Sequence, residues 1–268
     1  MKEKSEFLQF ALDIAKQAGE IQLSYFGNIE SISTKSTKID LLTNADIKSE
    51  NLLISKIRQK YPTHSIISEE SNNTIKDSEY TWIIDPLDGT TNFAHNLPIF
   101  AVSIALQKAN STICGVVYNP AADKCFYAQA KQGAYLNDKK IHPSNSDSLS
   151  DCLLATGFPY LHDKKYDLSF SIFKDFYDNT RGLRRLGAAA LDLCFVAMGR
   201  FDGFYEYNLN AWDICAGSLI AQEAGCEVTD WDGNNLPYDG SRILCSNKKI
   251  HSSMIKILTK QEYSIFFK

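Results

Sequence analysis

Hydrophobic and polar side chains alternate with a helical period at the start of the chain. Residues 5–26 predict a helix because apolar side chains recur there every three or four positions, and Gly27 supplies a stop. A similar pattern predicts a second helix from about residue 44 to residue 60, which ends before Pro62. The polar segment 31–38 between the two helices predicts a loop.

The middle of the chain changes to the period of two that marks strands. Two short apolar runs, 63–67 and 80–85, each lead into acidic residues. Beyond them, alternating apolar and polar positions broken by turn residues predict an antiparallel meander. Its predicted strands are 100–107, 113–118, 124–130 and 133–137.

The C-terminal part alternates strands with helices, which is typical of α/β proteins. The predicted strands are 152–156, 203–207, 226–229 and 242–245, and the predicted helices are 164–178, 187–199, 211–224 and 248–259. The polar run that begins at Pro143 is the most linker-like stretch, so we place a subdomain boundary there. We therefore expect an N-terminal α+β subdomain, 1–142, and a C-terminal α/β subdomain, 143–268, that together form one compact unit.

The composition is that of an ordinary globular protein, and it argues against several classes. Of 268 residues, 44% are hydrophobic, and 28 Lys and Arg face 32 Asp and Glu, which gives a net charge of −4. Since no long basic cluster occurs, we do not expect a nucleic-acid surface. The longest apolar run, 188–198, carries Asp192 and is far shorter than the ~20 residues of a membrane span, so no membrane segment is expected. Seven cysteines at irregular spacings predict reduced core thiols and a cytoplasmic protein.

The strongest local signal for chemistry is the run from Asp85 to Thr91, with the sequence DPLDGTT. An apolar strand leads into Asp85, Pro86 fixes the next φ angle, and Asp88 follows before Gly and Thr open a new segment. Two carboxylates thus lie at the end of a strand beside what reads as a helix N-terminus, an arrangement suited to hard cations and phosphate. The alternative is an ordinary turn in which these side chains only cap the backbone.

Three further acidic clusters have equally plain alternatives. Glu69 and Glu70 end an apolar strand but could be solvated loop charges. Asp213 opens an apolar helix and could simply be a helix cap, while Thr43 and Asp46 match a capping box for the second predicted helix. The occurrence of all these clusters in one chain is much harder to attribute to chance than any one alone.

These clusters together resemble the inositol monophosphatase family. The motifs that carry the resemblance are SEES at 68–71, DPLDGTTNF at 85–93 and WDICAG at 212–217, with Lys35-Ser36, the segment 40–46 and the stretch 187–194 in agreement. The resemblance spans essentially the whole chain. It implies a layered αβαβα sandwich of the inositol monophosphatase and fructose-1,6-bisphosphatase type, and a homodimer.

The resemblance also implies a magnesium site of two to three ions per subunit, sensitive to Li⁺. The implied metal ligands are Glu69, Asp85, the carbonyl of Leu87, Asp88 and Asp213. The implied catalytic residues are Asp46 and Thr90, which orient or deprotonate a water molecule, and Glu69, which helps through a further, weaker metal. The implied substrate contacts are Asp88, Gly89, Thr90, Gly187, Ala189, Glu206 and Asp213, with Glu206 on the substrate hydroxyls. From sequence alone Glu206 could equally be an exposed charge at a strand end.

The expected function is hydrolysis of a small phosphate monoester, foremost myo-inositol 1-phosphate, by a metal-activated water. Rivals in the superfamily are fructose-1,6-bisphosphatase, NADP phosphatase, histidinol-phosphate phosphatase and 3′-phosphoadenosine 5′-phosphate phosphatase. A rival of another class is a regulatory binding protein built on this fold. Arg184 and Arg185 could bind substrate phosphate, although the sequence favours a solvated or subunit-contact pair. The five histidines show no zinc-ligand spacing.

Overall fold

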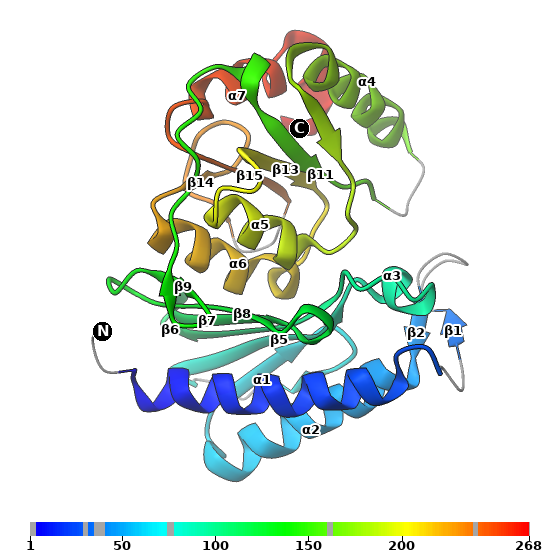
Figure 1. The fold of residues 1–268 in the computed structure, drawn as a ribbon, viewed down its shortest axis with the longest axis vertical. Helices are drawn as coiled ribbons and strands as arrows, with labels where there is room; N and C mark the ends of the chain where they lie inside the picture. Colours follow the sequence, from blue (N-terminus) through cyan, green and yellow to red (C-terminus); the bar gives the residue numbers. More distant parts are fainter. Residues whose placement is uncertain are drawn as a thin grey trace.

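The computed structural model describes residues 4–28, 32–34, 41–73, 78–159, 163–237 and 241–267. Over these ranges the chain forms stacked layers in the order helices, sheet, helices, sheet, helices (Figure 1). The layered αβαβα sandwich expected from the sequence is therefore confirmed. In the described part of the chain, no helix combines the length and the apolar character needed to cross a membrane.

The first layer is a pair of helices, α1 (Glu6–Tyr25) and α2 (Asn44–Lys60), which lie side by side under the larger sheet (Figure 1). The side chain of Ser5 caps α1 by accepting from the Leu8 N–H at 3.2 Å. Both helices match their predicted ranges to within about a residue, because the apolar stripe that predicts them is the face buried against the sheet.

The larger sheet has eight strands in the order β10-β9-β8-β7-β6-β5-β3-β4. Its strands are β3 (Ser65–Ser68), β4 (Asn72–Asn73), β5 (Tyr80–Asp88), β6 (Ala101–Lys108), β7 (Ser111–Asn119), β8 (Lys124–Gln129), β9 (Ala134–Leu136) and β10 (Lys139–Lys140). The predicted antiparallel meander is confirmed from β6 to β9, and only β3 and β5 run parallel. A short helix α3 (Thr90–Ala94) follows β5, and a 3₁₀ turn η1 (Pro120–Ala122) follows β7.

The central layer consists of α5 (Ala189–Ala197) and α6 (Ala211–Ala224), which pack between the two sheets. Both are apolar on nearly every side, as expected of helices covered on two faces. The backbones of α6 and β7 almost touch, because a Cβ built on Gly115 would lie 3.0 Å from the Ala216 carbonyl oxygen. This close contact fixes the position of α6 on the larger sheet.

The second sheet has five strands in the order β12-β11-β13-β15-β14, with α4 and α7 on its outer face (Figure 1). The strands β11 and β12 run parallel, as do β11 and β13, whereas β15 is antiparallel to both of its neighbours. The elements are η2 (Leu149–Asp151), β11 (Leu153–Thr156), α4 (Lys164–Asn179), β12 (Gly182–Arg184), β13 (Gly203–Tyr207), β14 (Glu227–Thr229), β15 (Arg242–Ser246), α7 (His251–Leu258) and η3 (Gln261–Phe267).

Some sequence predictions were wrong in detail. The predicted loop 31–38 contains a strand, β1 (Ile32–Thr34), which pairs with β2 (Leu41–Thr43). The strand predicted over 80–85 continues to Asp88 because a register shift accommodates Pro86, which cannot donate to the ladder. The strand β12 was not predicted, since three residues are too few for a period to be seen.

The run that begins at Pro143 is firmly held to the second sheet. The carboxylate of Asp202 accepts hydrogen bonds from the hydroxyls of Ser144 at 2.6 Å and Ser146 at 2.7 Å, and from the Leu153 N–H at 2.8 Å. Asn247 adds a hydrogen bond to the Ser144 hydroxyl at 2.9 Å. This polar stretch therefore owes its composition to a specific hydrogen-bond network as well as to its place between the two sheets.

Candidate functional site

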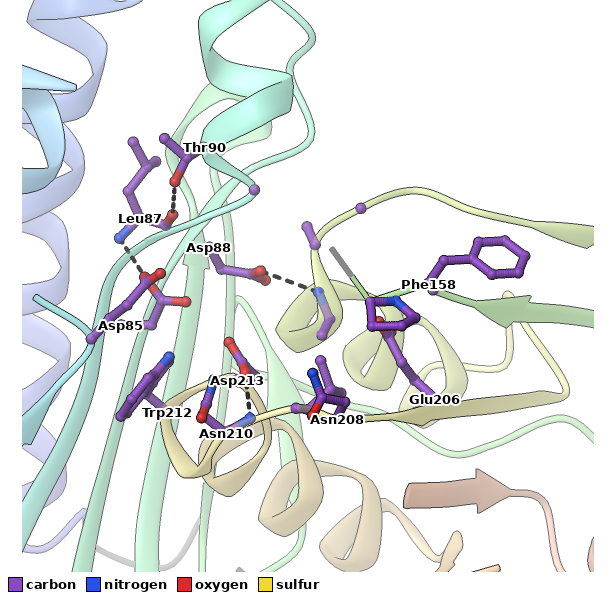
Figure 2. A pocket seen from close by; sticks show the side chains of 18 of the residues that line it. Asp85, Leu87, Asp88, Thr90, Phe158, Glu206, Asn208, Asn210, Trp212 and Asp213 are labelled. Atoms are coloured by element: carbon purple, nitrogen blue, oxygen red, sulfur yellow. Dashed lines mark hydrogen bonds between the residues drawn. The ribbon is translucent and has the colours of Figure 1, made fainter. Parts of the chain in front are cut away.

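A cavity of about 290 Å³ opens between the larger sheet and the central helices. It is lined by the end of β5, the turn after β11, the residues that lead into α5, and the segment from the end of β13 to the start of α6 (Figure 2). The acids Glu69, Asp85, Asp88, Glu206 and Asp213 all line it. The structure thus brings together acidic residues that are separated by up to 144 positions in the sequence.

The bulge at the end of β5 positions Asp85 and turns the Leu87 carbonyl toward the start of α3. Asp85 is only 2% exposed, and its carboxylate accepts from the Leu87 N–H at 2.9 Å. The Thr90 hydroxyl lies 3.0 Å from the Leu87 carbonyl oxygen. Burial, followed by the charges of Glu69, Asp88 and Asp213, raises the pKa of Asp85 well above its usual range.

Asp88 connects the larger sheet to the central helix α5. Its carboxylate accepts hydrogen bonds from the backbone N–H groups of Ala189 at 3.1 Å and Ala190 at 3.0 Å (Figure 2). The N-cap residue of α5 is Ala188, which has no side chain for this purpose, so Asp88 caps α5 from a distance. Burial is the main cause that raises the pKa of Asp88 to about 7.

Asp213 both caps a helix and lines the cavity. It forms a capping box with Asn210 at the start of α6, and its carboxylate accepts from the Asn210 N–H at 2.6 Å. Burial and the charges of Glu69 and Asp88 nevertheless raise its pKa to about 8. The capping interpretation and the functional interpretation are therefore compatible, because the cap uses only part of the carboxylate.

Asp46 shows the same double use. Thr43 caps α2 and donates from its N–H, at 2.8 Å, and from its hydroxyl, at 2.5 Å, to one carboxylate oxygen of Asp46. The other carboxylate oxygen accepts from the Thr90 hydroxyl at 3.0 Å. Asp46 is fully buried and is not among the described residues that line the cavity, whereas Thr90, which donates to it, is one of them.

The remaining predicted substrate contacts also line the cavity. Gly89 has a φ of +89°, and a Cβ there would lie 2.8 Å from the Ile99 carbonyl oxygen, so only glycine fits this turn. Gly187 and Ala189 line the wall that leads into α5. Glu206 lies against Gly157, where a Cβ would overlap its carboxylate, and burial raises its pKa to about 8. Glu206 is thus a cavity residue and not an exposed charge at a strand end.

The donors present fit a hard divalent cation. Carboxylates of Glu69, Asp85, Asp88 and Asp213, with the Leu87 carbonyl, offer only oxygen atoms, which Mg²⁺ and Ca²⁺ prefer. The charges of Glu69 and Asp88 raise the pKa values of both Asp85 and Asp213, as closely spaced like charges do. Within the described ranges no three of them converge as a group that could already hold an ion.

Sequence reasoning underrated some cavity residues. Arg185 lines the cavity, whereas the sequence favoured a solvated or subunit-contact pair for Arg184 and Arg185. Asn208 and Asn210 also line it, and the only signal for them was their place just before Trp212 and Asp213. The predicted contributions of Lys35, Ser36 and Asp40 lie outside the described residues.

The sequence matches the inositol monophosphatase family over residues 3–263. One similar relative is the putative Nus factor SuhB of Neisseria meningitidis serogroup B, 43% identical over 255 residues that cover 94% of this chain and 98% of the relative. Another is the inositol-1-monophosphatase of Mesorhizobium japonicum, 36% identical over 260 residues that cover 96% and 97% of the two chains.

Solved structures agree with this placement. The extragenic suppressor protein suhB from Bartonella henselae superimposes with a TM-score of 0.91 at 37% identity, covering 96% of this chain and all of that one. An IMPase/NADP phosphatase complexed with Mg²⁺ and phosphate superimposes with a TM-score of 0.84 at 25% identity, over 94% and 95% of the two chains. By sequence motifs, by fold and by the acids gathered in its cavity, this chain belongs to the inositol monophosphatase family.

Proposed function

We propose that this protein is a magnesium-dependent phosphatase that hydrolyses a small polyol or sugar phosphate, with myo-inositol 1-phosphate as the reference substrate. The observation that carries the proposal is the cluster of acids in one cavity, beside the N-termini of α5 and α6, in which the pKa values of Asp85, Asp88 and Asp213 are raised. Such helix ends favour anions, and closely spaced acids favour cations, so phosphate and metal suit the same cavity.

Glu69, Asp85, Asp88, Asp213 and the Leu87 carbonyl would hold the metal. When bound, Mg²⁺ would neutralise the acids, polarise the phosphate and lower the pKa of the attacking water. The structure with Mg²⁺ and phosphate among the relatives supports this choice of ion for the present chain.

The chain itself supplies a path for the proton of the attacking water. The Thr90 hydroxyl can donate to Asp46 or to the Leu87 carbonyl, each 3.0 Å away, while its lone pairs accept a hydrogen bond from water. Because Thr43 anchors the other oxygen of Asp46, that carboxylate keeps a fixed orientation toward Thr90. Thr90 therefore orients the water and Asp46 receives the proton.

The alcohol end of the substrate would lie toward Gly187, Ala189 and Glu206. Asp88 holds the backbone of this wall through the Ala189 N–H, so the wall and the acid cluster keep a fixed separation. Glu206 would accept hydrogen bonds from substrate hydroxyls. The preferred leaving group is therefore an alcohol that carries further hydroxyl groups.

A second candidate function is a regulatory binding role. The observation that favours it is the name Nus factor carried by relatives that are 43% and 42% identical to this chain. The complete set of cavity acids favours retained catalysis, because a protein that only binds partners gains nothing from a cluster of mutually repelling charges.

The experiment is phosphate release from inositol 1-phosphate, fructose 1,6-bisphosphate, NADP, histidinol phosphate and 3′-phosphoadenosine 5′-phosphate, each with Mg²⁺ and with EDTA. We expect turnover that requires Mg²⁺ and favours a polyol or sugar phosphate. Absence of Mg²⁺-dependent turnover on the whole panel would overturn the proposal and leave the binding role as the better explanation.

A further inference from the structure

The cavity contains a cation that neither the metal site nor the proton path uses. Arg185 precedes α5, and among the described residues that line the cavity it alone has a positively charged side chain. Over the described ranges, its guanidinium makes no hydrogen bond or ion pair within the protein. A guanidinium with five N–H donors therefore lines a cavity whose other charged groups, among the described residues, are all acids.

The position of Arg185 is built into the fold. A Cβ on Gly187 would lie 2.4 Å from Nη1 of Arg185, so the guanidinium rests directly on this glycine, whose φ is +79°. On either side of Gly187 the backbone is anchored, since Asn92 donates to the Leu186 carbonyl at 2.7 Å and Ala189 donates to Asp88. The turn that carries Arg185 is thus fixed relative to the acid cluster.

Glu206 is the matching group on the alcohol side. Its carboxylate also lacks a hydrogen-bond partner within the described ranges, and it is not within ion-pair distance of Arg185. The two are near enough for the Arg185 charge to act against the rise in the pKa of Glu206. A ligand between them could donate a hydroxyl to Glu206 and present an anion to Arg185.

We propose that Arg185 binds a second anionic group on the alcohol portion of the substrate. The preferred substrates are then phosphate monoesters of hydroxylated skeletons that carry a further phosphate or carboxylate. This inference rests on the proposed function, because it takes the acid cluster as the place of the phosphate that is cleaved. Without Arg185 the acids of the cavity would repel such a second anion.

The neighbouring arginine provides a matched control. Arg184 does not line the cavity; its guanidinium turns back to donate to the Leu183 carbonyl at 2.9 Å. Both residues are exposed and adjacent, so Arg184→Ala and Arg185→Ala remove the same charge from almost the same place in the chain. Only Arg185→Ala should change the recognition of a second anion.

The test compares two pairs of substrates in saturating Mg²⁺. One pair is fructose 1,6-bisphosphate and fructose 1-phosphate, and the other is 2-phosphoglycerate and glycerol 2-phosphate. We expect the wild type to prefer the member with the second anion, and Arg185→Ala to lower the ratio of the two kcat/KM values by roughly 10- to 100-fold, mainly through KM. Loss in the first pair identifies a phosphate and loss in the second a carboxylate.

An unchanged ratio in both pairs, an equal fall for both members, or the same loss in Arg184→Ala would overturn the inference. If the wild type turns over none of these four compounds and none of the phosphate monoesters in the panel above, the proposed function fails on its own. Calorimetric titration of the same four compounds in Mg²⁺ then decides, since a preference for the second anion that Arg185→Ala abolishes supports the inference and equal binding overturns it.

Discussion

The two ends of α6 carry acids with opposite tasks. Asp213, in the first turn, lies in the cavity beside other acids, and its pKa is raised to about 8. Glu223, in the last turn, accepts from three backbone N–H groups of the turn after β8, those of Lys131 at 2.6 Å, Gln132 at 3.0 Å and Gly133 at 2.7 Å. One acid is crowded by like charge and the other is surrounded by donors.

The helix dipole makes this contrast sharper. The N-terminus of a helix stabilises a negative charge and the C-terminus destabilises one. The dipole of α6 alone would therefore stabilise the ionised form of Asp213 more than that of Glu223. At the cavity, the charges of neighbouring acids destabilise the ionised form of Asp213. At the other end of α6, the N–H groups of the β8–β9 turn stabilise the ionised form of Glu223 against the dipole. Burial among like charges is therefore a stronger argument for a functional acid than the mere presence of a carboxylate.

The largest expected effect comes from Asp213→Asn. Turnover should fall by roughly a hundredfold or more because an amide supplies one neutral oxygen where the metal needs a charged one. Melting of the metal-free variant should match or exceed that of the wild type, since one repelling charge is gone. Steady-state kinetics and melting curves in EDTA check both outcomes, and a near-normal rate would remove Asp213 from the metal site.

Magnesium should stabilise the wild type by about 2.7 kcal/mol when its concentration is one hundred times Kd. The reason is that only the folded chain gathers the acids into one site. Denaturant unfolding with Mg²⁺ and with EDTA measures the difference. Asp213→Asn should lose most of this gain, and Glu223→Ala should keep it; equal responses of the two variants would contradict the contrast between the two ends of α6.

Glu223→Ala should lower the free energy of unfolding by about 1–3 kcal/mol, because it leaves three backbone donors without their acceptor. The value of kcat/KM should stay close to that of the wild type, since Glu223 is remote from the cavity lining. Denaturant titration and kinetics at one substrate check this pair of outcomes. A loss of activity as large as that of Asp213→Asn would show that the far end of α6 also serves the site.

The smallest expected effect concerns Asp192 of α5, which is 1% exposed and has one carboxylate oxygen without a hydrogen-bond partner. Burial, then the charges of Glu206 and Asp88, raise the pKa of Asp192 against the opposing charge of Arg185. A carboxyl with a raised folded-state pKa stabilises the fold below its unfolded pKa, and that stabilisation is lost as pH rises through the folded value.

The free energy of unfolding of Asp192→Asn should therefore rise relative to that of the wild type between pH 5 and pH 8 in saturating Mg²⁺, because the amide has no proton to lose. Unfolding titrations at the two pH values measure this shift. A difference between variant and wild type that does not change with pH would mean that Asp192 keeps the same charge throughout the range.

Short-range features of the site were predictable from the sequence. Thr43 with Asp46, and Asn210 with Asp213, form capping boxes within four consecutive residues, and Asp85 bonds to the Leu87 N–H two residues on. Helical and strand periods likewise placed most elements to within one or two residues. Such contacts depend on local backbone geometry, which neighbouring residue types determine.

Long-range features were decided by packing. Asp88 reaches the N–H of Ala189 across 101 positions, and Thr90 reaches Asp46 across 44. Nothing in the sequence distinguished Arg184 from Arg185. In the structure only Arg185 of the two lines the cavity, where its guanidinium lies against Gly187. The sequence by itself determined which acids are present and that Asp46 and Asp213 cap the helices in whose first turns they lie. The tertiary structure decided which of them share a cavity, because burial and repulsion between charges depend on distance through space and not along the chain.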